Sequence, residues 1–305
     1  MTRFAALREA FDEENYLLFN TDVRDAIERG IIKSGFEHFL NFGYREPRHG
    51  VPAGLPERLL QEIQEAEDKI VIAGHSHTVA IASYRASRAP EVRAFGEHEK
   101  MFVLDGSWPR DKAYWQQLRE LARNQTIVLV WGGNEHNLLY FFEEKDPFDF
   151  YSKHVERLIP GARIVPQRMI RKNFAERLKY LSIELRALVK AQSRQILLLG
   201  TPPPKKDNAE LARLMVGEGY FQDWAERLGE MRIADPYKRL KLWYLLQEMF
   251  EEEAAKANVR FVAVPTAAQD EDGFLQRELW ADDVTHGNAA YGQMMMDKLI
   301  AELGR

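Results

Sequence analysis

Short apolar runs alternate with amphipathic stretches from about residue 55 to the end of the chain. Helix-like stretches at 55–67, 111–123, 172–192 and 208–230 lie around or between most of these runs. Continuous apolar strands that alternate with helices predict a mostly parallel sheet covered on both faces. We therefore expect a three-layer α/β/α domain of flavodoxin-like type over residues 55–305. The strand-like runs are KIVIAG, MFVLDG, TIVLVWGG, ARIVP, QILLLGT and VRFVAVP.

Residues 1–50 follow a different pattern, which predicts a separate, small helical module. Thr21 precedes DVRDAIERG and Ser34 precedes GFEHFLNFG, so each is expected as an N-cap. Gly30 and Gly43 stand where these two short helices would end. The segment RHGVPAGLP then has the glycine and proline density of a linker to the larger domain.

Composition narrows the functional classes. Of 305 residues, 45% are hydrophobic and 29% are charged, which is typical of a globular protein that folds unaided. The net charge of -5 does not favour a nucleic-acid partner. The chain has no cysteine, which excludes disulfides, thiolate metal sites and cysteine nucleophiles. Without an apolar signal segment or a membrane-spanning run, we expect a cytoplasmic protein.

Chemistry is expected beyond the carboxyl ends of the strands, where ligands bind in sheets of this kind. The first run leads through Gly74 and His75 to Ser76, which is followed by a helical stretch. A serine at this turn exposes its hydroxyl and its backbone N–H to the same space, as a nucleophile requires. The alternative is that Ser76 is a helix N-cap with no chemical role.

Two further strand ends supply polar residues. The run TIVLVWGG is followed by Asn134, whose amide can donate to an oxyanion without adding charge, although Gly-Gly-Asn is also a common turn. Near the C-terminus, Asp283 precedes His286 by three residues. An aspartate at this spacing can reach the imidazole Nδ1–H, fix the tautomer and stabilise the imidazolium that forms when Nε2 takes a proton.

The order of these blocks resembles the SGNH (GDSL-like) hydrolase family over residues 68–303. IAGHSHT is similar to the nucleophile block, VWGGNEHN to the Gly-x-Asn block and DDVTHGNAAYG to the terminal Asp-x-x-His block. The resemblance implies that Ser76 is the nucleophile, that His286 is the base oriented by Asp283, and that Asn134 is an oxyanion donor. It also implies a glycine N–H donor, for which Gly106 is the candidate. No cofactor is required.

The sequence departs from the family pattern beside the nucleophile. The family usually has aspartate where this chain has His75 and Glu135, so the supporting hydrogen bonds must be arranged differently. His75 and His77 also form the His-x-His pattern with which metallohydrolases hold a metal. GHSH and GNEH resemble motifs of calcineurin-like metallophosphoesterases, but the order of blocks is wrong for that family, so no metal is expected.

Several residues have two interpretations. His77 and Trp131 are candidate substrate contacts, although buried aromatic rings are more often part of the core or of a cleft wall. Lys205 and Lys206, after Pro202–Pro204, are expected at a solvated loop tip. Residues 208–257 carry the apolar stripe YLLQEMF and are expected as a helical insertion that could act as a lid.

The N-terminal stretch YLLFNTDVRDAIERGIIKSGFEHFLNFGYREPR resembles a short helical module of bacterial proteins of surface-glycan synthesis. This resemblance implies a glycan context, unless the helices only pack on the larger domain. We therefore expect an esterase that acts on an O-acylated, for example acetylated, saccharide or a related small ester. The alternatives are an O-acyltransferase with the same three residues and a non-catalytic glycan-binding or scaffold protein. The sequence leaves the oligomeric state open.

Overall fold

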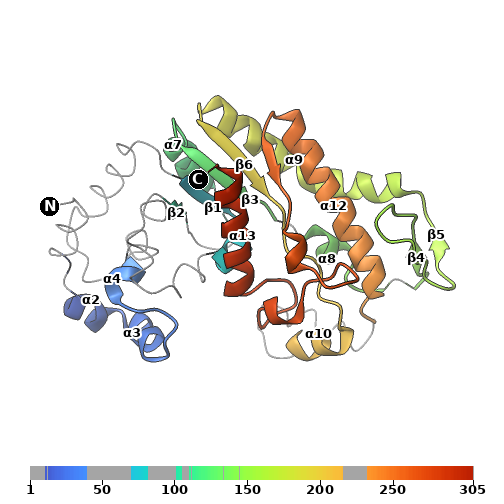
Figure 1. Ribbon diagram of the computed structural model, residues 1–305, viewed down its shortest axis with the longest axis horizontal. Coiled ribbons are helices and arrows are strands. Elements are labelled where there is room, and N and C mark those ends of the chain that lie inside the picture. The colour runs from blue at the N-terminus through green and yellow to red at the C-terminus, as the bar shows by residue number, and fades with distance from the viewer. Residues whose placement is uncertain are drawn as a thin grey trace.

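A five-stranded parallel sheet forms the centre of the larger domain (Figure 1). The computed structural model describes residues 11, 13–39, 70–81, 101–104, 110, 112–132, 134–143, 145–215 and 232–304. The strand order is β2-β1-β3-β6-β7, the order 2-1-3-4-5 of flavodoxin-like doubly wound sheets. The expected α/β fold is therefore confirmed. The strands are β1 (Ile70–Gly74), β2 (Met101–Val103), β3 (Thr126–Val130), β6 (Gln195–Leu199) and β7 (Arg260–Val262).

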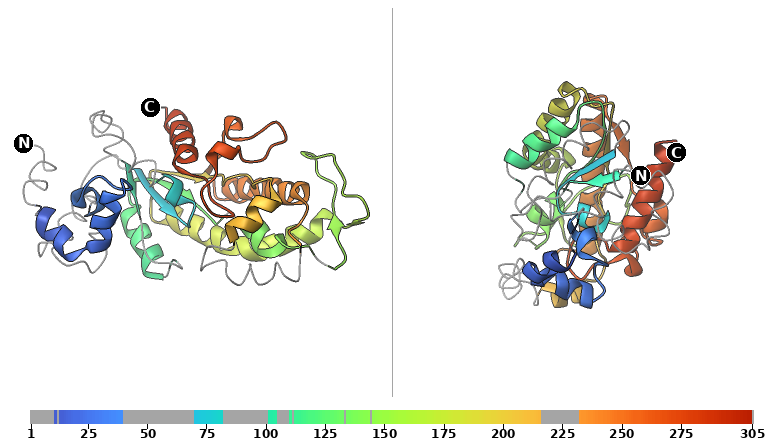
Figure 2. Two further views of the ribbon diagram at one scale, coloured as in Figure 1. Left: turned by 90° about the horizontal axis from the view of Figure 1, so that it is seen from below. Right: turned by 90° about the vertical axis from the view of Figure 1, so that its left-hand side faces the viewer.

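Helices cover both faces of this sheet, because alternate strand residues point to opposite sides. Ile127 and Leu198 face a cluster with α7, α9 and α12, whereas Val128 and Leu197 face α13. Figure 2 shows α13 separated from these other helices by the sheet. None of the described helices combines the length and the apolar composition needed to cross a membrane. The helices of this domain are α7 (Lys112–Leu121), α8 (Glu135–Tyr140), α9 (Gln167–Lys190), α10 (Asn208–Met215), α12 (Pro236–Lys256), α13 (Ala289–Glu302) and the short η5 (Thr266–Ala268) and η6 (Arg277–Leu279).

α12 belongs to the core, which corrects part of the expected lid over residues 208–257. Its buried residues include Leu245, Leu246 and Phe250, which pack in the same cluster as the sheet, so the apolar stripe faces inward. α10 packs in a different apolar cluster from α12, where its Leu211 packs with Phe142 just after the end of α8. Residues 216–231 lie outside the described residues, as does the helix expected at 55–67.

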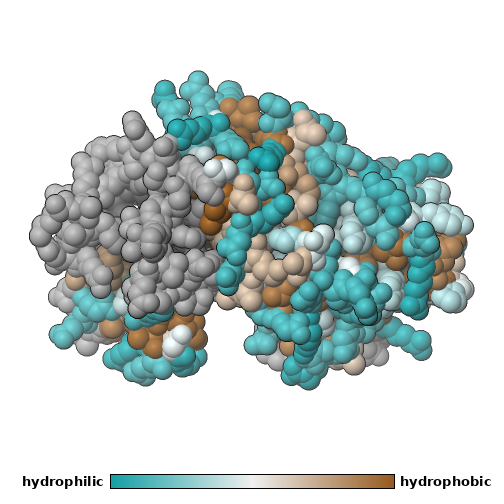
Figure 3. All heavy atoms as spheres, in the orientation of Figure 1, coloured by the Kyte–Doolittle hydropathy of each residue, from teal (hydrophilic) through white to brown (hydrophobic). Residues whose placement is uncertain are grey.

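The run ARIVP was expected in the central sheet, and this prediction is wrong. β5 (Arg163–Ile164) pairs instead with β4 (Phe148–Asp149) in a separate two-stranded sheet. Asp149 is fully buried there and forms an ion pair with Lys241 of α12 at 2.8 Å. Figure 3 shows apolar patches near this end of the molecule among mostly hydrophilic residues.

The described N-terminal residues form three short helices around their own apolar cluster. Ser34 caps α4 as expected and accepts a hydrogen bond from the Glu37 N–H at 3.0 Å. Thr21 is instead the first residue of α3, so its expected role as N-cap is wrong by one position. The linker RHGVPAGLP and Gly43 lie outside the described residues. The three helices are α2 (Glu13–Phe19), α3 (Thr21–Glu28) and α4 (Gly35–His38).

Candidate active site

Ser76 lies at the turn between β1 and the helical residues 78–81, half-buried at the carboxyl edge of the sheet. Gly74 ends β1 with φ +139°, and an added Cβ there would collide with the carbonyl of Val130 in β3. The His75 N–H donates to that same carbonyl oxygen at 2.8 Å. Tyr114 of α7 holds the turn from the other side, because its hydroxyl accepts from the Gly74 N–H at 2.8 Å. Backbone contacts therefore fix the Ser76 turn against β3.

His75 takes the place of the aspartate that the resemblance implied beside the nucleophile. The Gly132 N–H donates to His75 Nδ1 at 3.0 Å, so the ring acts as a neutral acceptor. Its edge packs against Trp131, with ring centroids 4.6 Å apart, and Trp115 lies at 5.4 Å. Burial and the nearby charge of Arg110 lower the pKa of His75 to about 4. An uncharged ring thus joins the two turns that carry Ser76 and Asn134.

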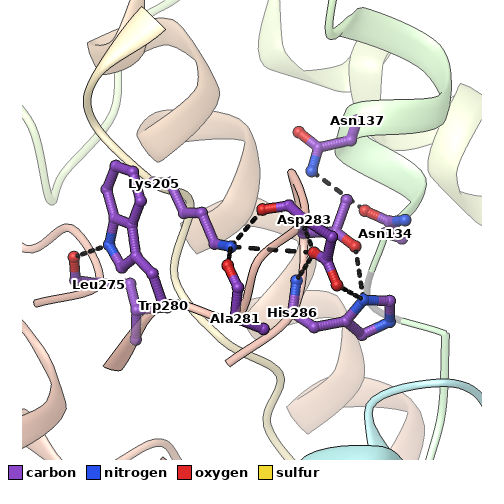
Figure 4. Close-up of polar contacts among 9 residues, drawn as sticks. Asn134, Asn137, Lys205, Leu275, Trp280, Ala281, Asp283 and His286 are labelled. Carbon is purple, nitrogen blue, oxygen red and sulfur yellow. Dashed lines mark hydrogen bonds and ion pairs between the residues drawn. The ribbon is translucent and has the colours of Figure 1, made fainter. Parts of the chain in front are cut away.

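Asn134 stands directly before α8, and Asn137 fixes the orientation of its amide. Asn137 Nδ2 donates to Asn134 Oδ1 at 3.0 Å (Figure 4). Because the oxygen of the amide is the acceptor, its Nδ2 is the atom left to donate elsewhere, and within the described part of the chain it has no acceptor. Asn134 Nδ2 can therefore donate to a further group, and the role of Asn134 as an oxyanion donor stays a prediction.

Asp283 and His286 form a tightly bonded pair on the loop before α13 (Figure 4). Asp283 Oδ2 accepts from His286 Nδ1 at 2.7 Å, and Oδ1 accepts from the backbone N–H groups of Thr285 and His286, each at 2.7 Å. Burial would raise the pKa of Asp283, but the hydrogen bonds and charge of His286, together with the charge of Lys205, hold it well below its usual range. The carboxylate is therefore ionised and sets the Nδ1–H tautomer, which leaves a lone pair on Nε2.

Two contacts bring the histidine loop to the serine turn. The His77 ring packs against the His286 ring with centroids 4.8 Å apart. On the same side, a Cβ added at Gly292 of α13 would collide with the backbone carbonyl of Ala80, so only glycine permits this approach. Val284 also packs against Phe142 at the end of α8. The turn of Ser76, the turn of Asn134 and the loop of His286 thus meet at one edge of the sheet.

Several polar atoms at this edge have no hydrogen-bond partner among the described residues. They include His286 Nε2 and both ring nitrogens of His77, whose side chain is 5% exposed. The Ser76 N–H has no acceptor among the residues that the structure covers, and no bond there joins Ser76 Oγ to His286 Nε2. In unliganded enzymes, hydrogen bonds between a nucleophile and its base are often long or poorly aligned and shorten when substrate binds. The arrangement can supply one base and two donors to an oxygen.

The remaining predicted residues differ in placement. Gly106 lies outside the described residues, so its role as a donor stays a prediction. Trp131 is 7% exposed and packs with Trp115 and His75, and its contact with substrate also stays a prediction. The rings of His75 and His77 have different neighbours, and the described residues contain no group of three His, Asp or Glu side chains arranged to hold a metal ion.

The prediction made for Lys205 is wrong. This residue was expected at a solvated tip, but its side chain is fully buried and contacts the loop of Asp283. Lys206 follows the expectation, with 44% of its side chain exposed and an ion pair to Asp272. Proline-rich neighbours are common in exposed loops, so the local sequence gave no signal that separated the two lysines.

No protein-family model and no curated protein matches the sequence. Solved structures that resemble the chain include a GDSL-like lipase from Bacteroides thetaiotaomicron, at 12% identity and a TM-score of 0.42, covering 81% of this chain and 96% of that chain. An extracellular lipase from Streptomyces rimosus matches at 13% identity and a TM-score of 0.41, over 77% of this chain and 99% of that chain. A variant of an acetyl-xylooligosaccharide esterase from Geobacillus matches at 13% identity and a TM-score of 0.38, over 80% and 97%. The fold assignment rests on the strand order and register of the central sheet.

Proposed function

We propose that this chain is a serine-dependent ester hydrolase of the SGNH type, with Ser76 as nucleophile and Asp283 and His286 as its supporting pair. The observation that carries the proposal is the bonded Asp283–His286 pair beside the Ser76 turn, with Nε2 of His286 buried and unpartnered among the described residues. A neutral imidazole with a free Nε2 is the base that serine activation needs.

The proposed mechanism is acyl transfer through the serine. Ser76 Oγ attacks the ester carbonyl carbon while its proton passes to His286 Nε2, and Asp283 stabilises the imidazolium that results. The carbonyl oxygen becomes an oxyanion that accepts hydrogen bonds from Asn134 Nδ2 and the Ser76 N–H, with Gly106 as a further donor. The C–O bond then breaks, and His286 returns the proton to the leaving alcohol. Water then attacks the acyl-serine carbonyl while one of its protons passes to His286 Nε2. The bond to Ser76 Oγ breaks, the acid is released, and His286 returns the proton to Ser76.

The substrate class that we propose is an O-acylated, most simply an acetylated, saccharide. Its support is the resemblance of the N-terminal module, together with the polar ring of His77 beside the base. His77 has two ring nitrogens without a described partner, and burial, reinforced by the charge of His286, lowers its pKa well below 6.5. A neutral ring of this kind can both donate to and accept from a substrate hydroxyl.

Hydrolysis of 4-nitrophenyl acetate tests the proposal with the wild-type protein, Ser76→Ala and His286→Ala. We expect each substitution to reduce kcat at least about a thousandfold, because either residue alone supports little of the serine mechanism. Ser152→Ala, on the β4–β5 segment, is the matched control and should retain full activity. A serine-reactive phosphonate should label Ser76 in the wild type. A kcat for Ser76→Ala within tenfold of wild type would contradict the proposal.

The same assay separates the alternatives. Adding a sugar alcohol as acceptor measures the ratio of acyl transfer to hydrolysis, and transfer that exceeds hydrolysis would identify an acyltransferase. Absence of both turnover and labelling in all three proteins would favour a non-catalytic glycan-binding role.

A further inference from the structure

Lys205 lies inside the protein, next to the loop that carries Asp283. Lys205 is 1% exposed. Its Nζ donates to the backbone carbonyl of Ala281 at 2.7 Å and also to the backbone carbonyl of Asp283 (Figure 4). The same Nζ lies 3.8 Å from Asp283 Oδ1. A buried ammonium is costly unless it is paired and hydrogen-bonded, and here the loop of the proposed catalytic aspartate supplies both.

The buried segment 201–205 leads the chain from β6 to this position. Thr201 follows β6 and is anchored by α12, because Trp243 Nε1 donates to its carbonyl at 3.0 Å and its N–H donates to Gln247 Oε1 at 3.1 Å. The three residues Pro202–Pro204 are buried and have no N–H groups to satisfy, so they can cross the interior in an extended form without a partner strand.

The C-terminal end of this segment, at Lys205, is held by a second buried cation. Arg239 of α12 is 1% exposed and donates from Nη1 to the Lys205 carbonyl at 2.8 Å and from Nη2 to Asn208 Oδ1 at 2.6 Å. The backbone of Lys205 is thus held by α12 while its ammonium reaches into the loop of residues 281–283. The position of the ammonium is therefore set by the core of the domain rather than by solvent.

We propose that Lys205 is a positioning residue of the site: its charge and its hydrogen bonds hold the 281–283 loop so that the Asp283 carboxylate stays aimed at His286 Nδ1. This inference rests on the proposed function, because the pair matters only if His286 acts as the base. It goes beyond the resemblance, which assigns no role to this lysine. Lys205 touches no reacting atom, so its effect should pass through Asp283.

Removing the charge should change the pH profile in a defined direction. Because Lys205 acts through Asp283, its loss should weaken the hydrogen bond and the charge with which Asp283 stabilises the imidazolium of His286. His286 then holds its proton less tightly, and the acid limb of the kcat/KM profile should move downward by about half to one pH unit in Lys205→Gln. We expect kcat to fall about tenfold to a hundredfold while KM changes less than about twofold, because the interaction acts in the transition state.

The experiment compares Lys205→Met, Lys205→Gln and Lys206→Met with the wild type in ester hydrolysis from pH 5 to 9. Lys206→Met removes the same charge from the neighbouring residue and should leave the profile unchanged. If Lys205→Met does not fold, as judged by circular dichroism, Lys205→Gln still tests the charge, since its amide can donate to one of the two carbonyls. In an Asp283→Asn background, Lys205→Gln should cause no further loss of kcat.

Three results would overturn the inference. They are a Lys205→Gln profile that matches Lys206→Met, an equal loss of kcat with and without Asp283, or a loss confined to KM. NMR titration of the His286 ring measures the same shift without substrate, so it tests the inference even if the wild type shows no turnover. If the wild type showed no turnover that depends on Ser76, this result would count against the proposed function alone.

Discussion

The turn of Ser76 and the loop of His286 are held in place by different means. Around Ser76 the described contacts are backbone hydrogen bonds between β1 and β3, the Tyr114 hydroxyl, the uncharged His75 ring, and the Arg110 guanidinium, whose Nε donates to the Gly74 carbonyl at 3.0 Å. Around His286 they are ionic: the Asp283 carboxylate and the buried Lys205 ammonium. The two regions meet where the His77 ring contacts the His286 ring.

This difference matches the charges that the proposed reaction would create. An oxyanion forms beside Ser76, where a fixed carboxylate would repel it, and the neutral His75 supports the turn without that cost. An imidazolium forms at His286, where the Asp283 carboxylate stabilises it. His75 therefore supports the Ser76 turn without placing a negative charge where the oxyanion would form.

The largest effect is expected from neutralising the ionic side. Asp283→Asn should lower kcat about a thousandfold to ten-thousandfold, because the amide no longer holds the required tautomer of His286. Asp282→Asn changes the adjacent, exposed aspartate and should leave kcat within about twofold, as expected for an exposed residue outside the bonded pair. Steady-state kinetics on the folded proteins measures both. A small loss in Asp283→Asn would remove the distinction between the two regions.

A graded pair of substitutions tests the side on which the oxyanion would form. Asn134→Ala should lower kcat about a hundredfold to a thousandfold with little change in KM, the usual effect of removing an oxyanion donor. Asn137→Ala only frees the Asn134 amide to rotate, so we expect a loss of about tenfold. In the Asn134→Ala background, Asn137→Ala should have no further effect on kcat. Additive losses would show that Asn137 acts otherwise than by orienting Asn134.

The smallest effect is expected on stability and concerns His75. Its pKa falls from 6.5 unfolded to about 4 folded, so the unfolded chain binds a proton that the folded protein excludes. The neutral His75 ring therefore contributes to the free energy of unfolding above pH 6.5. This contribution is lost as the pH falls toward 4, and the loss is roughly 3 kcal/mol at most.

Urea unfolding at pH 7.5, 6 and 5 measures this loss in the wild type and in His75→Gln. The variant should lose less stability than the wild type over the same range. His154→Gln, at a ring that pairs with Glu248 near the surface, is the control and should keep the wild-type dependence. Identical slopes for all three proteins would mean that His75 does not take up the proton on unfolding.

The sequence predicted what depends on local pattern. Five of the six apolar runs form strands of the central sheet. The spacing of Asp283 and His286, taken together with the order of the sequence blocks, predicted their hydrogen bond. ARIVP was misplaced because a short apolar run carries no information about its partner strand. The contact of Lys205 with Asp283 joins residues that are 78 positions apart, so only the folded chain reveals it.

Gly292 has a consequence for motion within the site. Its backbone lies against the carbonyl of Ala80, with no side chain between them that could deform. A displacement of α13 should therefore carry the helical residues 78–81 in the same direction. The loop before α13 bears His286, and the turn before residues 78–81 bears Ser76. Thermal fluctuations of this face of the protein should thus move His286 and Ser76 together, so that the distance between them varies less than the position of either.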